Sequence, residues 1–420
     1  MTLLKCVSIV LVAAVVVSTS ASPADAQTRA AALAALRDAK AAEPKPTPPS
    51  GLEGFLLNAA ETRLPARLFN PRSGPFVTVG LPGEGAGFGI GPAWRLQTAD
   101  RRWTVDGTLA ASVSRDWSAR VQVHTPDLLP TLGHNRVSLA VGAGRVRRAE
   151  DHFWGLGPSS DRAAIYALDR TDAAATLTAH LSPGLHVGAS VGVDTTSPAA
   201  GRGSGPQLSQ RFDGRTAPGL DRSPTYGSVS LSVDFDQRDT SPSTRTGRYF
   251  APQSLAGASS GRRLRVDWST HRSAEAGDYS QVVIDAQQYL PWLGGHRLLA
   301  LRALAHFTLA DADAVVPFYR LPSAGGTRVG RADPTFRWRD RHLFAAQVEY
   351  RYTVNPFMHG AVFVDAVQVA SSIDTLRWVD TRWTAGVGLR IGARGGAGLR
   401  LDLARGRDGV RLLLGLGHAF

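Results

Sequence analysis

Segments of about ten residues in which apolar and polar side chains alternate fill the chain from about Phe76 to its end. Turns that alternate between short and long separate these segments. In 229–235, for example, valine, leucine and phenylalanine occupy every second position, and serine or aspartate fills the others. Because successive side chains of a strand point to opposite faces, each segment predicts a strand with one apolar and one polar face. The repetition is typical of a closed antiparallel transmembrane β-barrel.

The last segments carry this pattern most clearly, with apolar residues at every second position of 383–391, 399–403 and 410–416, and with His418 and Phe420 next on the same face. A soluble β-sandwich also alternates. A sandwich of more than about 300 residues, however, divides into several domains, and its polar positions do not follow one pattern across every segment. We therefore expect an all-β fold, a membrane barrel over 76–420 whose charged residues line a wet interior. Four tryptophans near predicted strand ends would form its aromatic girdle: Trp103, Trp117, Trp292 and Trp378.

The first 26 residues are typical of a secretory signal peptide. Lys5 precedes an almost wholly apolar run, 7–17, and small residues follow up to position 26. The apolar run is shorter than the ~20 residues that a spanning helix needs. Cleavage before Gln27 would deliver the mature chain to the periplasm and remove Cys6, the only cysteine. We therefore expect neither a disulfide nor thiol chemistry.

Residues 27–75 predict a short periplasmic segment that is helical and proline-rich. The alanine-rich stretch 27–43 favours a helix, and the prolines of 44–49 favour an extended linker. About 50 residues are too few for a globular domain with its own core. A tether, a partner-binding helix and a small plug inside the barrel all fit. For a periplasmic or outer-membrane partner protein, 27–50 is the expected docking segment.

The formal charge of +12 comes almost entirely from arginine. The arginines are scattered along the chain, whereas a nucleic-acid binder concentrates them on one element. We therefore expect no nucleic-acid partner. A basic lumen, or a rim that faces the anionic head groups of outer-membrane lipid and lipopolysaccharide, accounts for the charge.

Five motifs follow one another in the second half of the chain: VDFDQRDTSPSTRTGRYF, VPFYRLPSAGG, FRWRDRHLFAAQVEYRY, FVDAVQV and AGVGLRIG. They begin at Val233, Val316, Phe336, Phe363 and Ala385. In this order and spacing they resemble the BamA/TamA superfamily of bacterial surface antigens, the outer membrane protein 85 type. The strongest match covers 233–420. The resemblance implies a barrel of sixteen strands, and counting the alternating segments alone predicts fourteen to sixteen.

The resemblance also implies a contact between the long sixth extracellular loop and the lumen. In the family a loop arginine, here Arg331, folds inward against a phenylalanine and an aspartate of a later strand, here Phe363 and Asp365. A charge-assisted contact in a confined lumen would pin the loop. The loop motif departs from the family pattern, since Ala332 and Asp333 replace its glycine and its aromatic residue. The alternative is that Arg331 is an ordinary solvated loop residue.

A run of alternate glycines, from Gly83 to Gly91, falls on one face of the first predicted strand. Because glycine weakens strand packing, the lateral seam between this strand and the one ending at Phe420 is expected to open, as the family's gate does. The seam residues are Gly85, Gly87, Gly89 and Phe420. The alternative is that these glycines only relieve crowding where the barrel closes.

We expect neither enzymatic activity nor a cofactor or bound metal. The stretch 257–261 matches G-x-S-x-G, but it lies in a turn between two predicted strands, whereas a nucleophile elbow needs a helix after the serine. His152 beside Asp151 has the ligand types of a metal site, yet a single such neighbour pair is usually a polar loop.

The function expected from the resemblance is assistance with the insertion or translocation of protein or lipid across the outer membrane of a Gram-negative cell. The space before Phe76 cannot hold even one of the family's periplasmic transport-associated domains, which predicts a subgroup that lacks them. A structural or passive-pore barrel that kept the fold and lost the activity is therefore the alternative. The sequence names no substrate.

Overall fold

The computed structural model describes residues 71–80, 89–100, 102–129, 136–239, 258–311, 313–355, 358–391 and 399–420. The expected signal peptide, most of the segment 27–75, and the residues Gly85 and Gly87 lie outside these ranges. No helix in the described ranges is long and apolar enough to cross a membrane.

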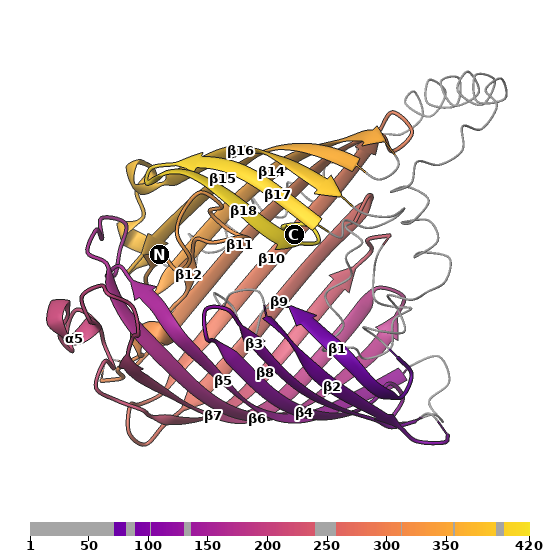
Figure 1. Cartoon of the computed structure of the whole chain (residues 1–420), viewed down its shortest axis with the longest axis horizontal. Helices are drawn as coiled ribbons and strands as arrows, with labels where there is room; N and C mark the ends of the chain where they lie inside the picture. Colours follow the sequence, from indigo (N-terminus) through magenta and orange to yellow (C-terminus); the bar gives the residue numbers. More distant parts are fainter. Residues whose placement is uncertain are drawn as a thin grey trace.

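Sixteen antiparallel strands form one curved sheet, in which each strand pairs with its neighbours along the chain (Figure 1). The predicted all-β architecture and the strand number implied by the resemblance are confirmed. The strands of this sheet are β1 (Gly74–Gly80), β2 (Gly89–Gln97), β3 (Thr104–Ser112), β4 (Trp117–Thr125), β5 (Arg136–Phe153), β6 (Ala164–Ser182), β7 (Leu185–Ala200), β8 (Thr225–Asp236), β9 (Gly261–Arg272), β10 (Tyr279–Trp292), β11 (Arg297–Ala310), β14 (His342–Asn355), β15 (Met358–Ala370), β16 (Arg382–Ile391), β17 (Leu399–Gly406) and β18 (Gly409–Leu416).

Short elements lie in the connections between these strands. They are the helix α5 (Leu208–Arg211), the 3-10 turns η3 (Phe318–Arg320), η4 (Ile373–Thr375) and η5 (Trp378–Asp380), and the hairpin of β12 (Ser323–Ala324) and β13 (Trp338–Arg339). The long connections 201–224 and 311–341 leave the same end of the sheet, which we call the loop end. The opposite end, the turn end, carries the short turns 183–184 and 293–296.

In the structure, the apolar positions of the alternating sequence lie on the exposed outer face of the sheet, and the polar positions lie on its buried inner face. In β18, Val410, Leu412 and Leu414 are 62%, 73% and 63% exposed on the outer face. In β17 next to it, Arg400 and Asp402 point inward and are almost inaccessible. Apolar side chains outside and charged side chains inside are the reverse of a soluble protein and the pattern of a membrane barrel.

The edge of the sheet differs from the prediction at its first strand. The glycine-rich segment contributes Gly89 to the second strand, where it lies between Gly80 of β1 and Ser112 of β3. The edge strand is instead β1, which is only seven residues long and carries no charged residue. Gly89 therefore lies inside the sheet and not at the seam, so this part of the prediction is wrong.

Gly91, on the same strand, has a packing role. A Cβ atom added there would lie 1.8 Å from the carbonyl oxygen of Leu109 on β3. Only glycine allows this close approach of two backbones.

The last strand also ends before its predicted limit. β18 stops at Leu416, and Gly417 adopts a φ of +71°, a left-handed conformation that glycine adopts without strain. The chain then turns into the lumen, where Phe420 packs near Tyr289 of β10, with ring centroids 6.3 Å apart. The prediction that Phe420 ends the last strand and faces the first one is therefore wrong.

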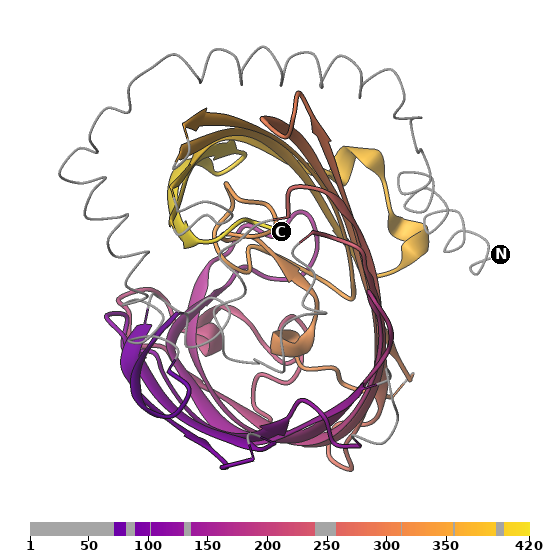
Figure 2. The ribbon, with the colours of Figure 1, turned by 90° about the vertical axis from the view of Figure 1, so that its right-hand side faces the viewer.

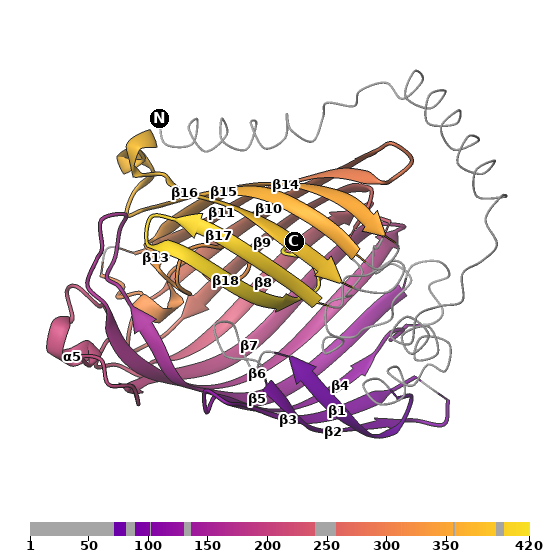
Figure 3. The same ribbon diagram turned by 45° about the horizontal axis from the view of Figure 1, so that its top comes forward.

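No backbone ladder joins β1 to β18 in the described part of the chain, and these strands form the two free ends of the sheet. Figure 3 shows the two edges on the same side of the barrel, β18 in yellow and β1 in indigo. The sheet curls as a barrel, but the pairing that would close it is missing among the described residues.

Candidate functional site

The connection 311–341, here called the lumen loop, folds back into the space enclosed by the sheet (Figure 2). Its sharp turn needs glycine. Gly325 has a φ of +114°, and a Cβ atom there would lie 1.9 Å from the carbonyl oxygen of Pro334. Hydrogen bonds from Gly325 N to Val329 O and from Asp333 N to Gly330 O close the turn. The tip of the loop is thus a folded unit that carries Arg331.

The structure brings Arg331, Phe363 and Asp365 together. The guanidinium of Arg331 donates from Nε and Nη2 to the two oxygens of Asp365, at 2.9 and 2.7 Å, and its backbone N–H donates to the same carboxylate at 3.1 Å. Its Cζ lies 3.4 Å from the centre of the Phe363 ring. Arg331 has no exposed surface, so the alternative of a solvated loop residue does not describe it.

Arg331 also joins a larger ion network that the sequence did not reveal. Its Nη1 donates to Glu349 of β14 at 2.5 Å. Glu349 accepts further hydrogen bonds from Arg351 at 2.7 Å and from Arg390 of β16 at 3.1 Å. Asp402 of β17 pairs in turn with Arg390. One loop residue is thereby linked to β14, β15, β16 and β17.

The network is dry. Arg331, Glu349, Asp365, Arg390 and Asp402 all have side chains that are 0% exposed. Burial by itself disfavours the charged guanidinium, but the carboxylates of Asp365 and Glu349 outweigh it and raise the pKa of Arg331 above its usual value. The expectation of a wet interior is therefore wrong for this part of the lumen.

Apolar contacts fasten the lumen loop to the last two strands of the sheet. Ala332, which stands where the family has glycine, packs with Phe363, with Ala404 of β17 and with Leu413 of β18. Asp333, which stands where the family has an aromatic residue, accepts a hydrogen bond of 2.7 Å from Trp338 Nε1. Burial raises the pKa of Asp333 to about 6. Both departures from the family motif thus fit into the same packed unit.

In the arginine-rich last part of the lumen loop, which begins at Phe336, arginine side chains lie close to aromatic rings. Arg339 is 2% exposed, lies within 6 Å of the rings of Phe153, Phe318 and Phe336, and donates to the carbonyl of Phe318 at 3.1 Å. Arg337 pairs with Asp408 of the turn before β18 at 2.6 Å. These arginines are buried in the contacts of the loop, which accounts for part of the basic composition.

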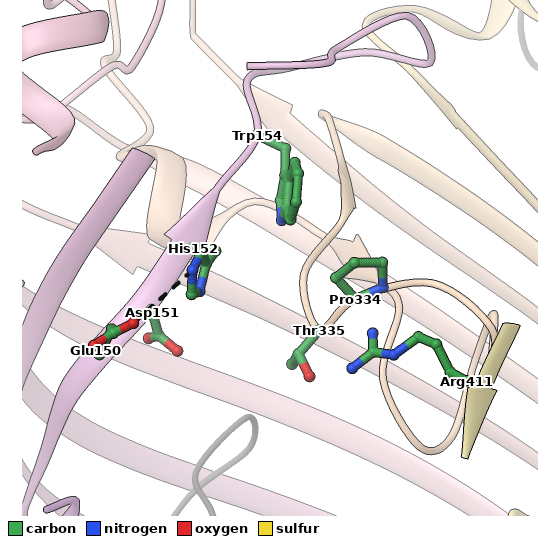
Figure 4. A pocket seen from close by; sticks show the side chains of 7 residues that line it. All are labelled: Glu150, Asp151, His152, Trp154, Pro334, Thr335 and Arg411. Atoms are coloured by element: carbon green, nitrogen blue, oxygen red, sulfur yellow. Dashed lines mark ion pairs between the residues drawn. The ribbon is translucent and has the colours of Figure 1, made fainter. Parts of the chain in front are cut away.

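A cavity of about 280 Å³ lies between β5, the lumen loop and β18 (Figure 4). His152 and Asp151 do not share a ligand point there, because His152 Nε2 lies 3.9 Å from Glu150 while Asp151 pairs with Arg148 at 2.8 Å. The described residues include no group of three metal-ligating side chains. The cavity is lined by Glu150, Asp151, His152, Trp154, Pro334, Thr335 and Arg411.

The described residues 258–261 of the G-x-S-x-G stretch lead directly into a strand. The hydroxyl and the backbone N–H of Ser259 both donate to Asp239, and β9 starts at Gly261. The helix that a nucleophile elbow needs after its serine is replaced by a strand.

Comparison with known proteins places the fold. No family model and no curated protein sequence matches the chain. Among solved structures, BamA from Haemophilus ducreyi lacking POTRA domains 1-3 aligns with a TM-score of 0.55 and 15% identity, over 81% of this chain and 69% of that chain. CdiB from Acinetobacter baumannii aligns with a TM-score of 0.46 and 11% identity, over 81% of this chain and 57% of that chain. The resemblance predicted from the motifs is confirmed at the level of the fold, and the chain has the BamA-type barrel fold.

Proposed function

We propose that the protein is an integral barrel of the Gram-negative outer membrane and that it assists the insertion or translocation of protein or lipid there. The location is supported by the outer face of the sheet, where large apolar side chains are exposed on strands from β2 to β18. An apolar band about 25 Å tall is the feature that a barrel presents to lipid. Outer-membrane lipid and lipopolysaccharide are the partners that follow from this location.

The edges of β1 and β18, which are unpaired among the described residues, are the observation that carries the proposed activity. A free strand edge presents unpaired N–H and C=O groups and accepts a further strand. In a membrane such an edge has no water to satisfy these groups, so a folding polypeptide strand is its natural partner. A barrel whose sheet closed on itself would offer no such template.

The bound lumen loop argues against a passive pore. The lumen loop lies inside the curved sheet, and its contact Arg331–Asp365 belongs to a network of charges with no exposed surface. A wide passive pore needs a solvated interior, whereas a gated barrel needs a wall that opens sideways. The observed arrangement supports the second.

Site-specific photo-crosslinking tests the proposal. A photo-reactive amino acid replaces Leu412 on the edge strand β18 or, as a matched control, Val364 in the middle of the wall on β15; both side chains point outward. During the folding of an added outer-membrane barrel protein in vesicles, we expect crosslinks to that protein from position 412 and not from position 364. Equal crosslinking at the two positions, or none at 412, contradicts insertion at the edge.

Conductance separates the two functional classes. Purified barrel in planar bilayers is expected to be closed, with at most brief openings, because the lumen loop is bound. A steady and large conductance would mean that the barrel is a passive pore.

A partner protein that binds through 27–50 would deliver substrate to the barrel. Pull-down from outer membranes with the full chain and with a variant lacking 27–50 tests this. We expect a partner that only the full chain retains, and equal recovery by both would remove the docking role.

A further inference from the structure

The connection 371–381 carries the most exposed aromatic side chain of the described residues. Its two 3-10 turns, η4 and η5, place Trp378 and its neighbour Val379 at 79% and 73% exposure. Two adjacent large apolar side chains that are mostly in contact with water are unfavourable relative to burial. Such a pair indicates a surface that is covered in the working protein.

This connection folds back over the outside of the wall. In β15 the outward side chains are those of Val362, Val364 and, further along the same alternation, Gln368. Gln368 Nε2 donates to the carbonyl of Arg377 at 2.6 Å, so the backbone of the connection lies against the outer face. Figures 2 and 3 agree, since both show the gold coil of this connection outside the barrel.

The outer face of the wall is also less exposed at this end. Ala370 of β15 and His342 of β14 lie opposite each other on the outward alternation. They are 4% and 6% exposed, whereas Val348, lower on the same face of β14, is 45% exposed. The wall is therefore less exposed at its loop end than in its middle. The ring of Phe307 on β11, with its centroid 5.8 Å from that of His342, contributes to this.

Trp378 continues the apolar outer face. Its ring makes an edge-to-face contact with the ring of Trp383, with centroids 5.6 Å apart. Trp383 is the outward residue at the start of β16 and is followed on that face by Val387, 53% exposed. The exposed pair of the connection therefore extends the apolar belt and does not form a separate patch.

Along the direction across the membrane, Trp378 and Trp383 lie at one border of the apolar outer face of the sheet. The other border is marked by Tyr352, paired with Gly360, and by Tyr350, which stacks on Trp292 at 5.6 Å. From Gly360 to Gln368 the strand advances eight residues, or about 27 Å along β15 and about 20 Å across a membrane at the usual tilt of ~40°. This is close to the ~25 Å of an apolar barrel band with aromatic girdles at both borders.

Charge at the connection fits the border of the membrane. Arg377 directly precedes the exposed pair, and its side chain is 73% exposed although Nε lies 3.2 Å from Asp380. A long cationic side chain beside tryptophan suits the head-group region, where the ring is half in lipid and the charge stays in water.

We propose that 371–381 is a lipid anchor, in which Trp378 and Val379 enter the outer leaflet at the border between acyl chains and head groups and Arg377 faces anionic head groups. The anchor rests on the proposed membrane location. It holds the wall at β15 and β16 in the leaflet, and β16 is two strands away from the edge strand β18.

Fluorescence quenching by lipid tests the anchor. In a Cys6→Ser background, the variants Trp378→Cys, Leu412→Cys and Arg215→Cys are labelled with an environment-sensitive dye and reconstituted into phosphatidylcholine vesicles. Part of the lipid carries a nitroxide near the head-group end of its acyl chain. Leu412 is the wall position, and Arg215 is an exposed residue of the loop 201–224 that serves as the water control.

The anchor predicts that dye at position 378 is quenched about as strongly as dye at 412, with a blue-shifted emission, while dye at 215 is unaffected. Quenching at 412 together with a signal at 378 like that at 215 overturns the anchor and leaves the membrane location intact. Absence of quenching at 412 overturns the membrane location itself.

The role of Arg377 is tested in the same vesicles. Adding anionic phosphatidylglycerol is expected to increase the quenching of dye at position 378, and the additional substitution Arg377→Gln to abolish this increase. The same increase in both proteins contradicts the contact between Arg377 and anionic head groups.

Discussion

The wall of β14 to β17 and the wall of β2 to β4 are built from the same alternating strands, but they hold their charges differently. In the first, Glu349 of β14 and Asp365 of β15 both pair with Arg331 of the lumen loop. Glu349 also pairs with Arg390 of β16. In the second, Arg95 and Asp106 pair between two adjacent strands at 2.5 Å. The pair Arg95–Asp106 joins two strands that backbone hydrogen bonds already hold together. The network around Arg331 of the lumen loop instead links four strands to one another.

The difference predicts which of the two edge strands, β1 or β18, moves when the barrel opens at the seam. β18 is packed through Leu413 on Ala332 of the lumen loop, and so belongs to the braced wall. β1 has seven residues and pairs only with β2 among the described residues. We therefore expect β1 and its neighbours to move when the wall opens, while β14 to β18 stay in place. Four substitutions test this comparison.

Glu349→Gln should have the largest effect. It leaves Arg331, Arg351 and Arg390 without their shared anion, and removing one partner of a buried ion pair costs about 3–5 kcal/mol. The matched control is Asp169→Asn, whose partner Arg145 is half exposed, and which should cost less than about 1 kcal/mol. Guanidinium unfolding followed by tryptophan fluorescence measures both. Equal losses would mean that the network is not a brace.

Asp333→Asn should stabilise the braced wall, but only at neutral pH. Burial raises the pKa of this loop carboxyl from 3.8 to about 6. The protonated carboxyl therefore contributes its full stability below pH 3.8, and this contribution is lost as the pH rises through 6. A rise of about two pKa units corresponds to about 3 kcal/mol at pH 7.5. Asparagine still accepts the hydrogen bond from Trp338 and does not ionise. The unfolding midpoint should therefore rise at pH 7.5 and stay unchanged near pH 3.5; a gain at both values would refute an origin in ionisation.

Asp106→Asn should weaken the other wall locally. It leaves Arg95, which is 7% exposed, with a neutral partner, at a cost of about 1–3 kcal/mol. Hydrogen exchange should accelerate in β2, β3 and β4 and remain unchanged in β14 to β16. Acceleration in both walls would show that they are coupled, which contradicts separate bracing.

Gly417→Ala should have the smallest effect, about 1 kcal/mol, because alanine is strained at a φ of +71°. The control Gly227→Ala lies on β8, where an added Cβ atom meets no neighbour within 4 Å. Thermal unfolding should separate the two variants. Identical stabilities would mean that the inward turn of the chain after β18 is not required.

The strands and the fold were predictable because alternation follows directly from strand geometry. The contact of Arg331 with Asp365 was expected only through the resemblance, and nothing in the spacing predicts it. The partners Glu349, Arg390 and Asp402 could not be assigned, because their convergence depends on strand register and on how far a distant loop enters the lumen. Each of them does occupy a polar position of its strand, which is the signal that was present.

The errors at the seam have physical causes too. Alternate glycines resemble a strand of their own, and the short β1, without charges, gives a weak pattern. The alternation continues past Leu416 through His418 to Phe420, so the side-chain pattern predicts a straight strand. The strand ends only because Gly417 adopts a positive φ angle. A glycine can adopt this angle or an extended one, so its presence in the sequence does not predict the end of the strand.

Hydrogen–deuterium exchange of the wild-type barrel in lipid, resolved strand by strand, tests the difference between the two walls most directly. We expect the amides of β1 and β2 to exchange much faster than those of β15 and β16, because one wall ends in β1, which pairs only with β2 among the described residues, and the other is braced by Arg331. Uniform protection of all four strands would contradict an open edge beside a braced wall.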